Sequence, residues 1–349
     1  MTWLPDSALD HLRHIADRPD VVDSRYQIVE RLGEGGMGTV YLAEDSELDR
    51  QVALKVLKEQ VFDERAARRM LEEARIIAKL EHPGIVPVHD VGTLPDGRNY
   101  YVMKLVRGKR LDEYFEASSP IGDRLRVFGR ICETVAFAHA HGVIHRDLKP
   151  QNVMVGEFGE VLVLDWGVAK RMRRQDAPPE TKETESTGPN PLSPKPTSDD
   201  DATRTRQTAH GTVIGTPAYM SPEQAHGDVD GVDERSDVFA LGAILYFLLT
   251  DRAPVGQTVF ERVQQREHVE FKPPRQSNPG VERPLNAICL KAISIEPDKR
   301  YPGAKELGRD VARFLDGQSV AAYRENPWEW VVRHAVKHRT PILLVMAYL

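Results

Sequence analysis

The segment at residues 145–152 has the sequence His-Arg-Asp-Leu-Lys-Pro-Gln-Asn, whose side chains suit the transfer of a phosphoryl group. Asp147 can accept the proton of an attacking hydroxyl group, and Lys149, two residues further on, can reach the phosphoryl group as it moves. Asn152 carries a side-chain oxygen that can hold a magnesium ion. A base, a cation and a metal ligand at this spacing predict a catalytic loop.

A second segment that suits phosphate chemistry lies upstream, where Gly33, Gly35 and Gly38 follow the pattern G-x-G-x-x-G. Glycines let backbone amides approach phosphate oxygens because no Cβ stands in the way. The flanking residues 26–32 and 39–43 have the composition of strands, which places the glycines on a hairpin turn. A dinucleotide-binding fold would instead begin a helix directly after its glycines, so it is disfavoured here.

Lys55 and Glu73 are predicted to form a buried ion pair. Lys55 alternates with Ala53 and Leu57 on one face of a predicted strand. Glu73 lies in a segment where the apolar residues Met70, Ile77 and Leu80 recur at three- and four-residue steps, which predicts a helix with Glu73 on its inward face. A carboxylate on a buried face needs a partner, and the strand lysine can supply it.

A further candidate metal ligand, Asp165, follows the apolar run 161–164, which predicts a buried strand. Trp166 comes next and carries an indole N–H that requires an acceptor when the ring is buried. The sequence Ser-Pro-Glu at 221–223 follows downstream.

Together these segments resemble the motifs of protein kinases. Residues 145–152 match the catalytic loop, Asp165-Trp166-Gly167 stands in the place of D-F-G, and residues 221–223 stand in the place of A-P-E. Over residues 24–317 the chain is similar to the eukaryotic-like (Hanks-type) protein serine/threonine kinases of bacteria. Lys149 and the sequence Gly-Thr-Pro at 215–217 are typical of the serine/threonine branch.

The resemblance implies an α+β fold with two lobes. Residues 25–106 should form an antiparallel sheet with one helix, and residues 107–317 a mainly helical lobe, with ATP bound between them. The expected reaction transfers the γ-phosphoryl group of ATP to serine or threonine hydroxyls of proteins. Mg²⁺ is the expected metal, with Mn²⁺ as an alternative.

The resemblance also carries individual roles over to this chain. The catalytic residues would be Asp147, Lys149 and Asn152, and the metal ligands Asn152 and Asp165. ATP would contact Leu32, Gly33, Gly35, Gly38, Val40, Ala53, Lys55, Glu73, Met103, Lys104 and Val106. Asp237 would steady the catalytic loop, and Arg300 would pair with Glu223.

Regulation is expected in the segment between the metal ligand and residues 221–223, which is longer than the family usually has. Residues 173–208 have almost no aliphatic side chains and should be disordered. This insertion is either an idle surface loop or a regulatory element. Arg146 is suited to bind a phosphate on this segment, and the favoured acceptors are Thr208 and Thr212. Autophosphorylation there would involve self-association of two copies.

Composition limits the other function classes. The chain has 349 residues, 40% of them hydrophobic, which is enough for two packed lobes. A net charge of −6 gives no general attraction for nucleic acid. Cys132 and Cys289 lie in apolar helical contexts and predict no disulfide framework, so a reducing compartment such as the cytoplasm is expected.

The two ends of the chain are predicted to lie outside the kinase domain. Residues 1–24 form an N-terminal extension, and residues 318–340 a basic linker. Residues 341–349 are an apolar run that reaches about half of the roughly 20 residues a spanning helix needs. They are either the start of a transmembrane helix, which would attach the domain to the inner face of the plasma membrane, or an apolar tail that packs on the kinase or a partner.

Two alternative functions share this fold. A pseudokinase or nucleotide-binding scaffold would be favoured by the loss of Lys55, Asp147, Asn152 or Asp165, and all four are present. A kinase of small molecules is disfavoured because residues 215–223 retain the segment that shapes a peptide-docking surface in protein kinases.

Overall fold

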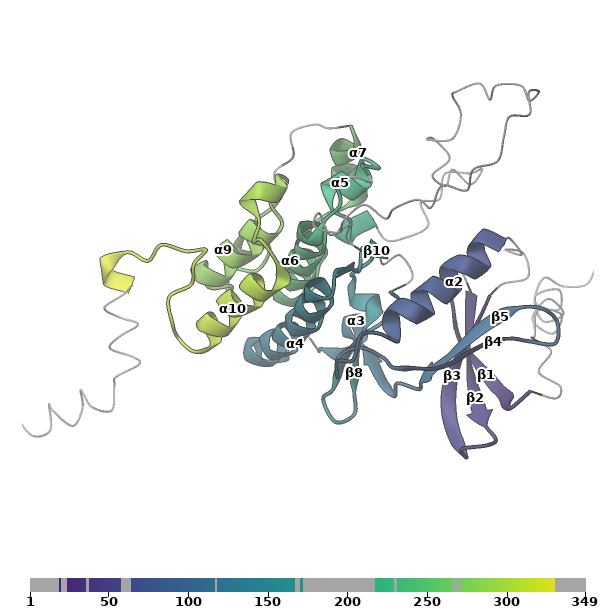
Figure 1. The fold of residues 1–349 in the computed structure, drawn as a ribbon. Helices are drawn as coiled ribbons and strands as arrows, with labels where there is room; N and C mark the ends of the chain where they lie inside the picture. The colour runs from purple at the N-terminus through teal and green to yellow at the C-terminus, as the bar shows by residue number, and fades with distance from the viewer. Residues whose placement is uncertain are drawn as a thin grey trace, which may run out of the picture.

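The computed structural model describes residue 19 and residues 24–35, 38–57, 64–116, 118–166, 170–171, 217–228, 231–265, 269 and 271–329. The predicted insertion at 173–208, the threonines Thr208 and Thr212, and the apolar run at 341–349 lie outside the described residues. So does nearly all of the predicted extension at 1–24. Within the described part, the fold is the α+β, two-lobed arrangement that the sequence predicts (Figure 1).

The small lobe is a five-stranded antiparallel sheet in the order β1-β2-β3-β5-β4. Its strands are β1 (Tyr26–Glu34), β2 (Gly38–Asp45), β3 (Arg50–Leu57), β4 (Val88–Thr93) and β5 (Asn99–Lys104). Helix α2 (Glu64–Ile77), the one helix among the described residues of this lobe, packs on the sheet (Figure 1). Strand β3 is buried from Val52 onward because it lies in the middle of the sheet, and this places Lys55 inside the lobe.

The large lobe is mainly helical. Its helices are α3 (Leu111–Tyr114), α4 (Ile121–Ala140), α5 (Pro222–Ala225), α6 (Glu234–Thr250), α7 (Gln257–Gln264), α8 (Pro274–Ser277), α9 (Arg283–Ala292) and α10 (Ala304–Leu315), with 3-10 turns η2 (Pro150–Asn152), η3 (Pro217–Tyr219) and η4 (Pro297–Lys299). Helix α6 is buried along almost its whole length, as expected of an apolar core helix, and its N-cap Asp233 accepts from the Arg235 amide. Helices α4, α9 and α10 pack around it (Figure 1).

Short strands of the large lobe flank the segments that carry the predicted site residues. Strands β6 (Gly108–Arg110), β8 (Val153–Gly156) and β9 (Val161–Val163) form one sheet, and β7 (Val143–Ile144) pairs with β10 (Lys170–Arg171). The Val163 amide donates to the Gly84 carbonyl at 2.8 Å, next to a bridge between Ile85 and Val163. The segment after α2 is thus tied to the strand that leads to Asp165.

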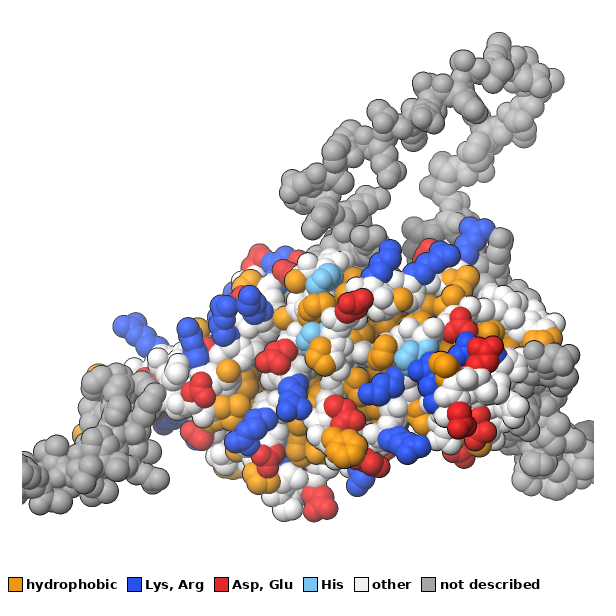
Figure 2. Space-filling view, turned by 60° about the horizontal axis from the view of Figure 1, so that its bottom comes forward, with side chains coloured by type: hydrophobic (Ala, Val, Ile, Leu, Met, Phe, Trp, Pro, Cys, Tyr) orange, Lys and Arg blue, Asp and Glu red, His pale blue; other side chains and the backbone are white. Residues whose placement is uncertain are grey.

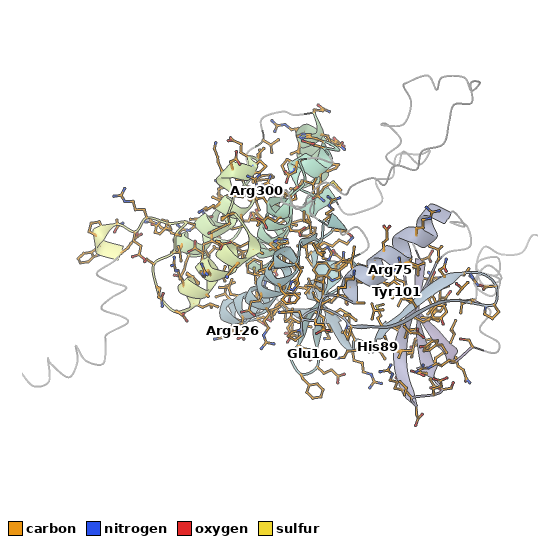
Figure 3. All side chains as sticks on the ribbon, viewed as in Figure 1. Arg75, His89, Tyr101, Arg126, Glu160 and Arg300 are labelled. Carbon is orange, nitrogen blue, oxygen red and sulfur yellow. The ribbon has the colours of Figure 1, made fainter. Side chains whose placement is uncertain are left out.

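The large lobe contains a buried ion pair between Glu223 and Arg300, as the sequence predicts. The two guanidinium nitrogens Nη1 and Nη2 of Arg300 donate to the two carboxylate oxygens of Glu223, at 2.7 and 2.9 Å. Arg300, labelled in Figure 3, also donates to the carbonyls of Arg235, Ser294 and Ile295. Burial alone would raise the pKa of Glu223, but Arg300 outweighs it and holds that pKa below its usual value.

The chain continues to pack on the large lobe after α10 and the turn at Gly317. The buried carboxylate of Asp310 accepts hydrogen bonds from the Ala321 and Ala322 amides, at 2.6 and 3.0 Å, and from the Tyr301 hydroxyl at 2.8 Å. Val320 is buried in the core of this lobe. The first residues of the predicted linker at 318–340 are therefore fixed to the kinase fold.

The described surface mixes both signs of charge. Figure 2 shows acidic and basic side chains interspersed on one face, with apolar side chains between them. Among the described residues, no helix combines the length and the apolar character that crossing a membrane requires.

Candidate active site

The predicted ion pair between strand β3 and helix α2 is present. Lys55 Nζ lies 3.0 Å from Glu73 Oε1 and 3.1 Å from Asp165 Oδ1, so one lysine joins three segments of the chain. Burial disfavours the charged form of Lys55, but Tyr101, Asp165 and Glu73 outweigh it, and the pKa of Lys55 lies well above its usual value. The charged form of the lysine is therefore favoured at this position.

The catalytic loop brings its three predicted residues together. Lys149 Nζ lies 2.8 Å from Asp147 Oδ2, and Asn152 Nδ2 donates to Asp147 O at 2.7 Å and to Oδ2 at 3.1 Å. The carboxylate of Asp147 remains 42% exposed, so an acceptor hydroxyl can reach it. Asn152 therefore holds the loop in shape and leaves the Asp147 carboxylate partly exposed.

Asp237 on α6 holds the catalytic loop through the backbone. Its carboxylate accepts from the amides of His145 and Arg146, each at 2.8 Å, and from His139 Nε2 at 2.8 Å. Burial alone would raise the pKa of Asp237, but His139, His145 and the loop amides hold it below its usual value. Arg146 has a positive φ of 69°, a strained conformation that these hydrogen bonds stabilise.

His145 connects the catalytic loop to Asp165. Its Nδ1 accepts from the Asp147 amide at 3.2 Å and its Nε2 donates to the Leu164 carbonyl at 2.9 Å, which assigns the Nε2–H tautomer. Trp166 packs against the His145 ring and donates its indole N–H to the Val163 carbonyl at 3.1 Å. The acceptor that the sequence requires for Trp166 is thus a carbonyl three residues earlier.

Asp165 and Asn152 offer the oxygen ligands that a hard divalent cation prefers. Burial alone would raise the pKa of Asp165, but Lys55 outweighs it and lowers that pKa, so the group stays ionised. Its φ is 55°, another strained conformation at this site. Asn152 uses its amide nitrogen for hydrogen bonds within the loop. Its side-chain oxygen Oδ1 takes part in neither of these bonds and remains available for a ligand. Two oxygens beside a nucleotide triphosphate fit Mg²⁺, which typically takes few protein ligands.

The residues predicted to surround ATP lie on β1, β2, β3 and β5 of the small lobe, on the connection between β1 and β2, on α2 and on the segment after β5. Gly33 and Gly38 end β1 and begin β2, and the Gly35 amide donates to the Gly38 carbonyl at 2.9 Å. A Cβ at Gly38 would come within 2.5 Å of the Val56 carbonyl, so only glycine fits there. Leu32, also predicted to contact ATP, is 47% exposed on β1.

The predicted adenine contacts come from β2, β3 and the end of β5. Val40 pairs with Lys55 across β2 and β3, and Ala53 pairs with Met103 across β3 and β5. Lys104 ends β5, and Val106 follows it at the junction of the lobes. Ala53 is buried and lies opposite Met103 in the pairing of β3 with β5.

Arg146 lies close to the catalytic loop, but its predicted partners Thr208 and Thr212 lie outside the described residues. Its Nε is buried and has no hydrogen-bond partner among the described residues. Burial lowers the pKa of Arg146, with a smaller opposing effect of Asp237. A buried guanidinium nitrogen without a partner is the arrangement expected of a residue that awaits an anion.

Two residues of the site were not identified from the sequence. Tyr101 on β5 donates its hydroxyl to Glu73 Oε1 at 2.9 Å, and His139 on α4 donates to Asp237. Tyr101 had a sequence signal, because it lies two residues before Met103 and so shares its face of the strand. His139 had none, because Asp237 is 98 residues away in the chain.

A strand lysine that contacts a helix glutamate and Asp165, together with the loop at 145–152 in a two-lobed α+β fold, is the arrangement of a protein kinase domain. The chain belongs to this family: it matches the protein kinase domain over residues 26–310. The resemblance to the bacterial serine/threonine kinases is thus confirmed at the level of the family.

Curated relatives carry that name. The chain is 35% identical to serine/threonine-protein kinase PknD of Protochlamydia amoebophila, over 87% of this chain and 32% of that protein. It is 36% identical to serine/threonine-protein kinase PknB of Mycolicibacterium smegmatis, over 87% of this chain and 45% of that protein. The chain therefore spans less than half the length of these relatives.

A solved structure agrees in fold. The crystal structure of the Mycobacterium tuberculosis PknI kinase domain aligns with 83% of this chain and 96% of its own, with a TM-score of 0.58 and 24% identity.

Proposed function

We propose that this domain transfers the γ-phosphoryl group of ATP to serine and threonine hydroxyls of proteins, including its own activation segment, with the residue roles given below. The observation that carries the proposal is a pair of contacts, Lys55 with Asp165 from separate segments and Asn152 with Asp147 within the catalytic loop. His145 connects the two pairs, because it bonds to the Asp147 amide and to the Leu164 carbonyl. All four residues whose loss marks an inactive relative are present, which disfavours a scaffold without catalysis.

Each side chain has a defined task in the proposed reaction. Lys55 and the glycine turn bind and orient the phosphates of ATP. Asp147 orients the acceptor hydroxyl and accepts its proton, while Lys149 lies beside it and stabilises the charge of the moving phosphoryl group. Asn152 and Asp165 would hold Mg²⁺, which supplies charge neutralisation at the phosphates when bound. Mn²⁺ is the alternative ion.

Adenine would lie against Ala53, between Leu32 and Val40 on one side and Met103, Lys104 and Val106 at the junction of the lobes. The burial of Ala53 and its pairing with Met103 support this orientation. The acceptor polypeptide would then approach from the exposed side of Asp147.

Regulation through Arg146 remains part of the proposal. Phosphorylation of Thr208 or Thr212 by a second copy of the kinase would supply an anion for the unpartnered Arg146 Nε. The proposed limits of the domain are residues 25–317, after an extension at 1–24. The linker at 318–340, the membrane anchor from 341, and a cytoplasmic location also remain proposals; two free cysteines fit a reducing compartment.

Asp147→Asn tests the catalytic assignment. The amide cannot accept the hydroxyl proton, so turnover with Mg-ATP and a generic protein acceptor should fall by about 10²–10⁴-fold, while the melting temperature stays close to that of the original protein. Asp123→Asn, an exposed change at the start of α4, is the matched control and should keep full turnover. Normal turnover of a folded Asp147→Asn protein would remove Asp147 from this role.

The same variant tests autophosphorylation. Mass spectrometry after incubation with Mg-ATP should find phosphate at Thr208 or Thr212 in the original protein and none in Asp147→Asn. A Thr208→Ala, Thr212→Ala double variant with full activity would show that the switch lies elsewhere.

A further inference from the structure

Tyr101 occupies a position between the sheet and helix α2 that no part of the proposed reaction yet uses. It is 2% exposed and lies on β5, where it pairs with Lys55 on β3. Its ring packs in one apolar cluster with Met70 and Ala74 of α2. Figure 3 labels Tyr101 within the small lobe, below α2.

The hydroxyl of Tyr101 adds a polar contact to this packing. It lies 2.9 Å from Glu73 Oε1, the same oxygen that Lys55 Nζ contacts at 3.0 Å. Burial, with a smaller contribution from Glu73, raises the pKa of Tyr101 far above its usual value, so the phenol stays protonated and donates. Lys55 Nζ also lies over the Tyr101 ring, 5.4 Å from its centroid.

Glu73 depends on this second donor. The carboxylate is 2% exposed, and its other oxygen, Oε2, is buried without a hydrogen-bond partner among the described residues. Lys55 divides its contacts between Glu73 and Asp165, so it does not hold Glu73 alone. A buried carboxylate with one shared cation is costly, and a neutral donor fixed on the neighbouring strand offsets that cost without competing for ATP.

We propose that Tyr101 is a positioning residue for the ATP phosphates: its hydroxyl fixes Glu73 on the sheet, and Glu73 in turn orients Lys55. The inference rests on the proposed role of Lys55. In this arrangement α2 is held against the sheet by two bonds from two strands, so the lysine is oriented before the nucleotide arrives. Tyr101 itself touches neither ATP nor the acceptor.

Tyr101→Phe removes the hydroxyl and keeps the ring. Loss of one hydrogen bond to a charged group predicts a decrease of about tenfold in kcat/KM for ATP, seen mainly as a higher KM for ATP. The KM for the protein acceptor at saturating ATP should not change. A purely structural loss would lower the folded fraction, and hence kcat, while both KM values stayed constant.

Tyr301→Phe is the matched control. Tyr301 is also 2% exposed and donates its hydroxyl at 2.8 Å to a buried carboxylate, that of Asp310, in the other lobe. The two variants should lower the melting temperature by similar amounts, and only Tyr101→Phe should change the KM for ATP. An unchanged KM for ATP in Tyr101→Phe would overturn the proposal.

A double-mutant cycle with Glu73→Gln tests the route through Glu73. If Tyr101 acts through that carboxylate, Tyr101→Phe should add little to the kinetic effect of Glu73→Gln. Fully additive effects on kcat/KM for ATP would also overturn the proposal. Lys55→Met separates the two hypotheses: full turnover of that variant would refute the proposed site, whereas its inactivity beside a normal Tyr101→Phe would refute only the role of Tyr101.

Discussion

The two lobes each contain a buried ion pair between distant segments, and the two pairs differ in how completely they are satisfied. In the large lobe, Arg300 and Glu223 meet through two parallel hydrogen bonds, and three carbonyls and Ser236 occupy further sites on the two groups. In the small lobe, Lys55 reaches a single oxygen of Glu73, shares itself with Asp165, and leaves Glu73 Oε2 without a partner among the described residues.

We interpret the large-lobe pair as structural and the small-lobe pair as part of the proposed catalytic site. An arginine fork that matches a carboxylate with both arms is saturated and has no capacity for a ligand. A lysine has three rotatable donors, so Lys55 keeps one for a phosphate after it contacts Glu73 and Asp165. We therefore expect changes to the large-lobe pair to affect stability, and changes to the small-lobe pair to affect turnover.

Lys55→Met should have the largest effect. The loss of one preorganised cation at the phosphates predicts a decrease in turnover of about 10²–10³-fold, with a much smaller change in melting temperature because Tyr101 still donates to Glu73. Turnover and thermal unfolding should be measured on the same sample. Lys79→Met, at an exposed lysine just after α2, is the control and should match the original protein. Near-normal turnover of Lys55→Met would contradict the assignment of the small-lobe pair to catalysis.

Arg300→Met should act on stability. Removing one partner of a buried pair leaves the Glu223 charge uncompensated and predicts a loss of about 3–5 kcal/mol in the free energy of unfolding, measured in urea. Turnover per folded molecule should remain near normal. The neighbouring Lys299→Met removes an exposed pair with Glu296 and should cost less than about 1 kcal/mol. Equal losses of unfolding free energy in the two variants would mean that the buried pair of Arg300 stabilises the fold no more than the exposed pair of Lys299.

The large-lobe pair also predicts a pH dependence. The folded-state pKa of Glu223 lies below its ordinary value of 4.5, so the pair stabilises the fold fully above that pH and loses its effect as the pH falls through the depressed pKa. The difference in unfolding free energy between the original protein and Glu223→Gln should therefore be constant from pH 7 to about 5 and shrink below it. If this difference in unfolding free energy instead increased as the pH fell, the pair would not have the lowered pKa of Glu223 that the prediction assumes.

Trp166→Phe should have the smallest effect. The variant keeps an apolar ring beside His145 and loses only the donor to the Val163 carbonyl, which predicts a stability loss of about 1 kcal/mol. Turnover should remain within about twofold of normal, because Asp165 and its contact with Lys55 are unchanged. A folded variant with little activity would show that the indole N–H is required for the working geometry of Asp165.

The comparison also explains what the sequence predicts well. The roles of Lys55, Glu73 and Asp165 are local in origin, because strand alternation and helical periodicity place each side chain on a defined face of its own element. The apolar run also predicts the core helix α6, whereas the two lobes follow from the resemblance to the protein kinases. The predicted roles in ATP binding and regulation stay predictions.

The remaining contacts depend on register and on long-range packing. Tyr100 and Tyr101 are adjacent and chemically identical, and the pairing of Tyr101 with Lys55 decides which one faces α2. His139 reaches Asp237 only because α4 packs beside α6. Asp310 binds backbone amides, which every residue carries, so no sequence pattern marks its partners.

The contact between Asp310 and the amides of Ala321 and Ala322 sets a lower limit on the length of a fragment that can fold independently. The family match ends at Asp310, yet a chain cut there or at Gly317 would leave the buried carboxylate without two of its three hydrogen-bond donors. A fragment intended for expression should therefore extend past residue 322. The fold should extend beyond the shared domain, because the segment after Gly317 is held both by main-chain hydrogen bonds to Asp310 and by the buried side chain of Val320.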